Sequence, residues 1–489
     1  LCTDIQINGQ VQPLDEALRA EIMAANDDYA RNALRVLALA RRELPPRPTG
    51  ADAPPGAAYT PERVERGLTF LGLAAMMDPP RPEVAEAIQT CRNAGIRWVM
   101  ITGDYGLTAE SVARRVGMLS TPGVRILTGA EIDAMSDDEL QAALGEEVVC
   151  ARMAPDHKLR LVSAFQARGD VVAVIGDGVN DAPALRRADV GIAMGITGTD
   201  VAKEAADVVL TRDNFGAIVD AIKEGRAVYD NIRKVMTYIF ASNVPEVAPF
   251  ILSALFNIPL ALTIMQVLAI DLGTDLLPAM ALGVEQPEPD IMRRPPPRRD
   301  PALFDRALLV RAILAIGLAQ TVLCYAGFFW VYYQGGFTNL LHLPRLDVLP
   351  FEQQPLDSLA YTAMLATTVF HVGVVMAQIG NAFACRTERS SVRRAGLFSN
   401  RALLAAIVFE LALIGALVYA PPLAVIFNHA PIPPAYWVGL ILYAPVVYLL
   451  DWLRKAILRR RQNIPGDTIA GSCNGEITRS INNTIGGAR

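Results

Sequence analysis

Two polar motifs in the first half of the chain each follow an apolar run and are suited to binding a phosphoryl group. ITGD occupies 101–104, and GDGVNDAPAL occupies 176–185. If both runs are parallel strands, both motifs lie at the carboxyl edge of the sheet, where open α/β sheets bind ligands. A threonine hydroxyl and backbone N–H groups can hold phosphoryl oxygens there, and two aspartates on one turn can hold Mg²⁺. In the alternative interpretation, Asp177 and Asp181 only cap a turn.

A third candidate for this site is Lys158, in the sequence APDHK at the start of an expected helix. A lysine can neutralise the charge of a phosphoryl group during its transfer. Because a lone lysine at a helix start is usually solvated, the hypothesis depends on its combination with the two motifs. Together, the three elements predict a phosphoryl-transfer site.

The second half of the chain places carboxylates inside long apolar stretches. SNVPE occupies 242–246, and DLGTD occupies 271–275. Spacings of three and four residues put the polar side chains of each motif on one helix face. The candidate ligands are Ser242, Asn243, Glu246, Asp271, Thr274 and Asp275.

An ionised carboxylate at mid-membrane is costly unless it is paired, protonated or bound to a metal. Three carboxylates in two adjacent spans therefore favour a cation site, and oxygen ligands suit hard cations such as Ca²⁺, Na⁺ or K⁺. Pro245, Pro249 and Gly273 are expected to loosen the helices and to free backbone carbonyls as further ligands. The alternative is a proton-sharing polar network that only fixes packing.

The phosphate motifs belong to a region that alternates between strand and helix patterns. Apolar runs at 97–101, 148–151 and 171–175 are each followed by a turn and an amphipathic segment. This alternation predicts a mostly parallel, doubly wound, Rossmann-like α/β sheet. A stretch rich in Pro, Gly and Ala at 45–60 is typical of a linker or surface loop.

Six apolar stretches after residue 234 are each long enough to cross about 30 Å of hydrocarbon as a helix. They are 235–256, 260–283, 307–333, 358–384, 402–426 and 435–453. Basic residues gather in alternate loops, so the positive-inside rule places residues 1–234 and the C-terminus in the cytoplasm. This loop pattern disfavours the alternative of six helices buried in a soluble protein. The expected parts are a domain remnant with a linker (1–60), an α/β domain (61–234), an all-α six-helix membrane bundle (235–461) and a disordered tail (462–489).

Composition agrees with a membrane protein and excludes other classes. Of 489 residues, 52% are hydrophobic and 19% are charged, which rules out a disordered chain. The net charge of -5 argues against nucleic acid as a partner. Six cysteines without a CxxC and four scattered histidines predict neither a disulfide framework nor a zinc site.

From about Arg35 to Arg461, the sequence resembles the P-type cation-transporting ATPases. GDGVNDAPAL, TGD and Lys158 are similar to the signature of their phosphorylation domain, which implies a haloacid-dehalogenase-like fold and the use of ATP and Mg²⁺. Residues 35–40 resemble the end of the nucleotide-binding domain, and 78–81 resemble the hinge that follows it. Six spans after this domain are typical of type II pumps.

Within type II, SNVPEVAPF and IDLGTDLLPA are most similar to sodium/potassium and proton/potassium pumps. Calcium pumps of the reticulum kind carry asparagine where this chain has Asp271. Sodium pumps carry an aspartate where this chain has Asn381, and a pair of glutamates where it has Glu410 and Leu411, so transport of three sodium ions is in doubt. The resemblance implies Na⁺/K⁺-type or Ca²⁺ transport across a plasma membrane, with monovalent ions favoured.

The resemblance also implies roles for individual residues. They are Thr102, Gly103, Asp104 and Lys158 for the phosphoryl group, Asp177 for Mg²⁺, Asn180 and Asp181 for ordering the lysine and the phosphate, Arg35, Asp78 and Arg152 for ATP, and Tyr238 and Gln378 as additional ion ligands. The ion site is expected to be coupled to phosphoryl transfer through a helix that continues from Asn214 into the first span.

The family's phosphorylated aspartate lies in a DKTGT motif, which does not occur in this sequence. Because phosphoryl transfer needs its nucleophile, we expect the chain alone to form no phosphoenzyme. We therefore expect a C-terminal fragment whose partner is the N-terminal part of the same pump. Two alternatives stay open: a truncated, non-catalytic regulatory membrane subunit, and a membrane-tethered phosphatase with Asp104 as the nearest candidate nucleophile.

Overall fold

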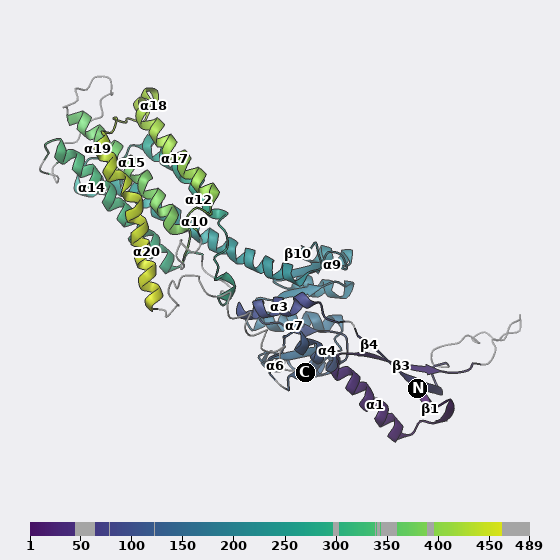
Figure 1. The fold of residues 1–489 in the computed structure, drawn as a ribbon. Helices are drawn as coiled ribbons and strands as arrows, with labels where there is room; N and C mark the ends of the chain where they lie inside the picture. The colour runs from purple at the N-terminus through teal and green to yellow at the C-terminus, as the bar shows by residue number, and fades with distance from the viewer. Residues whose placement is uncertain are drawn as a thin grey trace, which may run out of the picture. The chain divides into compact units, whose positions relative to one another are not determined.

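The computed structural model contains two compact units, whose elements are labelled in Figure 1. The α/β unit comprises Leu1–Lys223 and Met292–Pro301, and the helical unit comprises Glu224–Ile291 and Ala302–Arg489. The structure describes residues 1–44, 64–77, 79–121, 123–296, 303–337, 339, 343, 359–388 and 396–461. The expected linker at 45–60, the expected tail at 462–489 and Asp78 lie outside these residues.

The α/β unit begins with a mixed sheet and a helix, which are β1 (Cys2–Ile7), β2 (Gln10–Pro13), α1 (Glu16–Arg31), β3 (Arg35–Arg41) and β4 (Leu68–Met76). The strand order is β2-β1-β4-β3, and only β1 and β4 pair in parallel. Asn8 and Gly9 join β1 to β2 with φ angles of 50° and 82°, as a type I′ turn requires. Asp15 caps α1 by accepting the Leu18 N–H at 2.9 Å.

Two parallel three-stranded sheets follow, with orders β5-β7-β6 and β10-β9-β8. Their strands are β5 (Met100–Ile101), β6 (Arg125–Thr128), β7 (Val148–Ala151), β8 (Ala173–Gly176), β9 (Val190–Met194) and β10 (Val208–Leu210). The helices of this region are α3 (Pro82–Asn93), α4 (Gly106–Arg115), α5 (Gly129–Ala134), α6 (Asp137–Ala143), α7 (Pro155–Ala167), η1 (Val179–Asp181), α8 (Ala182–Arg187) and α9 (Asp200–Ala205). Parallel strands alternating with helices confirm the predicted α/β class.

The strands differ from the prediction in length and pairing. β7 coincides with its predicted run, but only Met100–Ile101 of the run 97–101 pairs with β7. Arg97 instead donates to the Leu144 carbonyl oxygen at 2.8 Å, and β8 begins only at Ala173. No ladder joins β5 to β8 in the described part of the chain, so the single sheet that we expected is divided into two.

The helical unit is built from the elements after the last strand. They are α10 (Phe215–Phe256), α11 (Ile264–Ala269), η2 (Ile270–Asp275), α12 (Leu276–Gly283), η3 (Ile291–Arg293), α13 (Arg306–Leu309), η4 (Val310–Gly317), α14 (Leu318–Gln334), α15 (Leu359–Cys385), α17 (Arg401–Tyr419), α18 (Pro421–Ile426), α19 (Pro434–Ile441) and α20 (Tyr443–Arg461), with α10 and η3 shared between the units. As expected, α10 continues from the residue after Asn214 through the whole first span.

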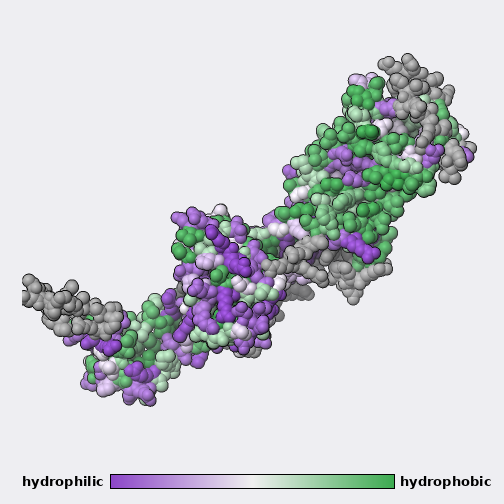
Figure 2. Space-filling model, turned by 180° about the vertical axis from the view of Figure 1, so that it is seen from behind, coloured by the Kyte–Doolittle hydropathy of each residue, from purple (hydrophilic) through white to green (hydrophobic). Residues whose placement is uncertain are grey.

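The described residues contain six helices that are long and apolar enough to cross a membrane, as predicted. They are Phe215–Phe256, Ile264–Gly283, Arg306–Gln334, Leu359–Cys385, Arg401–Tyr419 and Pro434–Leu458. The fifth ends at Tyr419, earlier than expected, because Pro421 and Pro422 start the separate helix α18. Figure 2 shows hydrophobic side chains gathered over the surface of this bundle, as a surrounding of lipid requires.

Helix α15 is the centre of the bundle. It is buried without interruption from Thr368 to Ala382, and it packs against α14, α17, α19 and α20. A helix that is apolar and buried all round is enclosed by other helices. At Gly380 the backbone of α15 approaches Ala444 so closely that a Cβ would lie 2.8 Å from the Ala444 Cα and nearer still to its carbonyl oxygen.

Gly380→Ala is expected to destabilise the helical unit by about 2 kcal/mol, because the added methyl group forces α15 and α20 apart. Thermal unfolding in detergent measures the loss. Gly415→Ala is the matched control, since a Cβ there meets nothing within 4 Å. Equal unfolding temperatures for the two variants would contradict the close packing at Gly380.

Candidate functional site

The loops after β5 and β7 are joined by backbone hydrogen bonds at the carboxyl edge of the sheet. Thr102 donates its N–H to the Cys150 carbonyl oxygen at 2.9 Å, and Met153 donates to the Thr102 carbonyl oxygen at 3.0 Å. The Thr102 hydroxyl oxygen accepts the Asp104 N–H at 3.1 Å. This turn leaves Gly103 and Asp104 exposed at the edge where the sequence predicts a phosphoryl group.

Lys158 and Asp181 form the polar centre of this edge. The Lys158 Nζ lies 2.5 Å from the Asp181 Oδ1, and Asp181 is 8% exposed. The other carboxylate oxygen accepts the backbone N–H groups of Asp177 at 3.3 Å and Gly178 at 3.1 Å. A Cβ on Gly176 would lie 2.5 Å from the Asp181 Cβ, so this turn needs glycine. The predicted association of Lys158 with the GDGVND loop is therefore present.

The other predicted residues named here are exposed. Asp177 and Asn180 lie exposed on the loop after β8. Arg35 places its Nε 4.0 Å from the Asp104 Oδ1, and the Arg152 guanidinium lies 5.1 Å from the centre of the Tyr105 ring. Both arginines thus reach the loop after β5.

Asp181→Ala is expected to destabilise the α/β unit by about 2 kcal/mol, because it leaves Lys158 and two backbone N–H groups without their acceptor. Thermal unfolding followed by circular dichroism measures this loss. Asp200→Ala is the control, since that side chain is 99% exposed. The structural role of Asp181 is refuted if the two variants unfold at the same temperature.

Two residues that the sequence did not single out hold the neighbouring loops. The Thr199 N–H donates to the Asp177 carbonyl oxygen at 2.8 Å. The Asp213 carboxylate accepts the N–H groups of Ile196 at 3.0 Å and Thr197 at 2.8 Å, and its own carbonyl oxygen accepts from Arg81. A threonine before an expected helix is a capping signal, whereas nothing local marks Asp213, because its partners lie on another loop.

The backbone N–H of Ile196, and then Thr197, lower the pKa of Asp213 from 3.8 to about 2. A lowered pKa in the folded state adds stability above the unfolded value, and this stability is lost as the pH falls from about 4 toward 2. Asp213→Asn is therefore expected to be less stable than the wild type at pH 7, with a difference that vanishes near pH 2. Acid titration of the unfolding temperature tests this, and a difference independent of pH would count against it.

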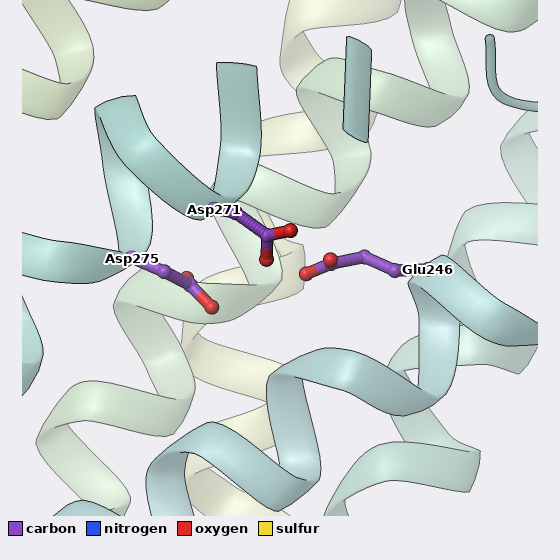
Figure 3. A group of neighbouring side chains, drawn as sticks. All are labelled: Glu246, Asp271 and Asp275. Atoms are coloured by element: carbon purple, nitrogen blue, oxygen red, sulfur yellow. The ribbon is translucent and has the colours of Figure 1, made fainter. Parts of the chain in front are cut away.

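Three carboxylates meet inside the helical unit. Glu246 of α10 and Asp271 and Asp275 of η2 each offer an oxygen, and these atoms all lie within 4.8 Å of one another. Glu246 and Asp275 are buried at 4% and 7% exposure, while Asp271 is exposed. Figure 3 shows the Asp271 and Glu246 side chains pointing toward each other, with Asp275 beside them. The predicted carboxylate cluster is therefore present.

A layer of neutral polar groups surrounds the carboxylates. The Tyr238 hydroxyl donates to the Asp275 Oδ1 at 3.0 Å, and Gln378 donates to the Glu246 Oε1 at 3.3 Å. Asn381 donates to the Ser242 hydroxyl oxygen at 3.3 Å. The two additional candidates, Tyr238 and Gln378, thus contact the carboxylates directly. The amides of Gln378 and Asn381 come from α15, at the core of the bundle.

Among the described residues, no lysine or arginine forms an ion pair with this cluster. The buried ion pairs of the described part involve other acids: Glu285 pairs with Arg386, Glu288 with Lys234, and Asp451 with Arg311 and Lys455. Among the ion pairs of the described residues, none includes one of the three clustered carboxylates. In the apolar bundle such a group needs protons or a bound cation, because unpaired charge is costly there.

The remaining candidates of this site differ in exposure. Asn243 is exposed, while Ser242 and Glu246 are buried. Viewed along the helix axis, Ser242 and Asn243 lie on either side of Glu246 and about 100° apart, so the two side chains face different surroundings. Thr274 is buried, and its hydroxyl donates to the Ile270 carbonyl oxygen at 3.1 Å.

The expected loosening is present at Gly273, where Ile270–Asp275 is a π-helix. α10 remains one helix through Pro245 and Pro249. Pro245 nevertheless has no N–H for the Ala241 carbonyl oxygen, which accepts from the Gln320 side chain at 3.2 Å. A π-helical turn inserts an extra residue and is common at functional sites.

Comparison with known proteins identifies the family. The family model for the C-terminus of cation transporting ATPases matches residues 259–457, that for the cytoplasmic domain N of P-type ATPases matches 1–83, and that for haloacid dehalogenase-like hydrolases matches 159–222. The chain belongs to the type II P-type cation ATPases. Its α/β unit accordingly has the haloacid-dehalogenase-like fold.

Three relatives of this P-type ATPase chain span nearly all of its length. A calcium-transporting ATPase of Bacillus subtilis (strain 168) is 40% identical over 442 residues, which are 89% of this chain and 45% of the relative. The sodium/potassium-transporting ATPase subunit alpha-4 of Rattus norvegicus and subunit alpha-1 of Oreochromis mossambicus are both 34% identical over 94% of this chain and 48% of their own length. The chain therefore spans about half the length of these relatives.

Proposed function

We propose that this chain is the C-terminal part of an ATP-driven cation pump. The observation that carries the proposal is the cluster of Glu246, Asp271 and Asp275, whose oxygens converge within 4.8 Å inside membrane-length helices without a neutralising lysine or arginine among the described residues. Such a cluster suits a transported cation better than a resident one, because one member, Asp271, is exposed and leaves the group accessible.

The phosphoryl chemistry is assigned to the edge of the α/β unit. Thr102, Gly103 and Lys158 bind the phosphoryl group, Asp177 holds Mg²⁺, and Asn180 and Asp181 keep the lysine and the phosphate in order. Arg35, Asp78 and Arg152 contact ATP, with Asp104 in the same loop. These assignments rest on the Lys158–Asp181 pair and on the arrival of both arginines at the Thr102 loop.

The acceptor of the phosphoryl group is an aspartate outside this sequence, because no DKTGT motif occurs in it. The chain alone therefore forms no phosphoenzyme, and its partner is the N-terminal part of the same pump. Coupling between the chemistry and the ion site runs along α10, which is a single helix from Phe215 past Glu246.

The transported ion is assigned as monovalent, in a cycle of the Na⁺/K⁺ type, with Ca²⁺ as the alternative. Asp271 supports the monovalent assignment, and the relatives carry both kinds of name. Glu410 adds a fourth acid near the cluster: it is 1% exposed, neither of its oxygens has a hydrogen-bond partner in the described part, and it interacts electrostatically with Asp275. Asn381 is neutral, which favours fewer than three sodium ions.

The chain is a multi-pass integral membrane protein. We place it in the plasma membrane, as the resemblance to sodium/potassium pumps implies. We place residues 1–234 and the C-terminus in the cytoplasm, because basic residues gather in alternate loops between the spans. The functional division is then a nucleotide-domain remnant at 1–60, a phosphorylation domain at 61–234, a transport domain at 235–461 and a tail at 462–489.

Equilibrium binding of ²²Na⁺, ⁸⁶Rb⁺ and ⁴⁵Ca²⁺ to the purified chain in detergent tests the ion site. The wild type is expected to bind a monovalent ion, and Glu246→Gln and Asp271→Asn are each expected to weaken it at least about tenfold, as loss of a charged ligand does. Asp200→Asn, in the exposed part of the α/β unit, is the matched control.

Two results of this measurement overturn parts of the proposal. Binding of Ca²⁺ alone, unaffected by Asp271→Asn, replaces the monovalent assignment with calcium. Binding of no cation removes the transport site. Reading the coding DNA upstream of Leu1 tests the fragment assignment separately: four more spans and a DKTGT motif support it, and a start codon directly before Leu1 contradicts it.

A further inference from the structure

Helix α7, which carries Lys158 in its first turn, begins without an ordinary N-cap. The first N–H groups of any helix lack partners within the helix, and Ser, Thr, Asp or Asn usually supplies an acceptor. The residue at this position is Ala154, whose side chain has no acceptor, and Pro155 follows it. The two preceding helices begin differently, because Thr128 caps α5 and Ser136 caps α6.

The imidazole of His157 bonds to the backbone of the cap residue itself, in the place of a side-chain cap. Its Nδ1 accepts the Ala154 N–H at 3.0 Å. This is the place that Glu131 occupies at the start of α5 and Glu139 at the start of α6, each accepting the N–H of its own cap residue, at 2.7 and 2.8 Å. Since Nδ1 accepts, the ring proton lies on Nε2, which donates to the Asp133 Oδ1 at 3.1 Å.

The ring is seated tightly against α5. A Cβ on Gly129 would lie 2.6 Å from the His157 Nδ1 and 2.9 Å from the Arg152 carbonyl oxygen, so only glycine leaves room for the imidazole. One turn further along α7, Arg160 donates to the carbonyl oxygens of Ile132 at 2.5 Å and Met135 at 2.6 Å. The start of α7 is thus fixed to α5 by two side chains that flank Lys158.

We propose that His157 is the positioning residue for Lys158. By accepting the Ala154 N–H it closes the first turn of α7, and Asp133 and Gly129 fix the ring in the tautomer and orientation that this requires. The turn then presents the Lys158 ammonium group to Asp181. The consequence for catalysis rests on the proposed role of Lys158 at the phosphoryl group. The positioning of Lys158 by His157 does not depend on that role.

Reductive methylation of the full chain, quantified by mass spectrometry, measures how firmly Lys158 is held. His157→Ala is expected to speed methylation of Lys158 about fivefold, the factor that corresponds to loss of one helix cap. Lys203 is the internal control, because its side chain is 30% exposed, close to the 24% of Lys158, and it lies on a different helix. Its rate is expected to stay the same.

Rescue separates the acceptor from the bulk of the ring. His157→Gln keeps an acceptor at this position and is expected to restore slow methylation of Lys158, because glutamine is an ordinary partner of a helix N-cap. Gly129→Ala leaves His157 in place but displaces its ring, so it is expected to behave like His157→Ala. The proposal is overturned if His157→Ala leaves Lys158 protected, or if His157→Gln is as reactive as His157→Ala.

Faster methylation of Lys203 as well as Lys158 in His157→Ala would mean general unfolding. The proposal is then tested by the rates of Lys158 methylation in the other two variants, which are expected to be fast in Gly129→Ala and slow in His157→Gln. In the intact pump, His157→Ala is expected to weaken inhibition of ATP hydrolysis by orthovanadate, a phosphate analogue, about fivefold. An intact protein without ATPase activity would sink the proposed function and leave the methylation result standing.

Discussion

The arrangement of the helical unit depends on three carboxylates that converge in an apolar bundle. Glu246, Asp271 and Asp275 repel one another at the spacing that the structure shows, and the surrounding helices offer them no cationic side chain in the described part. Charge of one sign in a low-dielectric interior is tolerable only with protons or a cation. The described helices therefore supply no positive charge to these carboxylates, so the protons or the cation come from the surroundings.

The neighbouring elements are arranged around that constraint. The π-helix at Ile270–Asp275 puts two aspartates on consecutive turns beside Glu246, and the amides of Gln378 and Asn381 come from the otherwise apolar α15. The proposed phosphoryl site of the α/β unit differs, because Lys158 already has a carboxylate partner in Asp181. In that proposal, an arriving phosphoryl group competes with Asp181 for the lysine.

Sequence patterns predicted the fold class and the span count. They also singled out Lys158 with the GDGVND loop, and the three carboxylates, which the structure brings together. Each of these rests on local periodicity or on a motif read along one element. They failed where the outcome depends on another element. Ser242 and Asn243 both have a spacing that suits a ligand beside Glu246. Of the two, Ser242 contacts Asn381 on α15, and the sequence does not show this contact. The prolines of α10 looked disruptive, yet the surrounding bundle keeps the helix continuous. The role of Asp213 depends on partners in a separate loop, and that of His157 depends on Asp133 and Gly129 of α5 as well as on the nearby Ala154, which no periodicity reports.

The enclosure of α15 bears on how the helical unit is made. α15 is buried from Thr368 to Ala382, and its tightest neighbour, Ala444, belongs to α20, the last helix of the unit. A ribosome delivers α20 only after some sixty further residues, so α15 enters the membrane before its partner exists. During that interval the face of α15 at Gly380 lacks its helix neighbour, whereas Gln378 and Asn381 find their partners on α10, which is made earlier. Assembly of the bundle is thus completed from its C-terminal end, and a chain cut before α20 leaves the Gly380 face of its central helix uncovered.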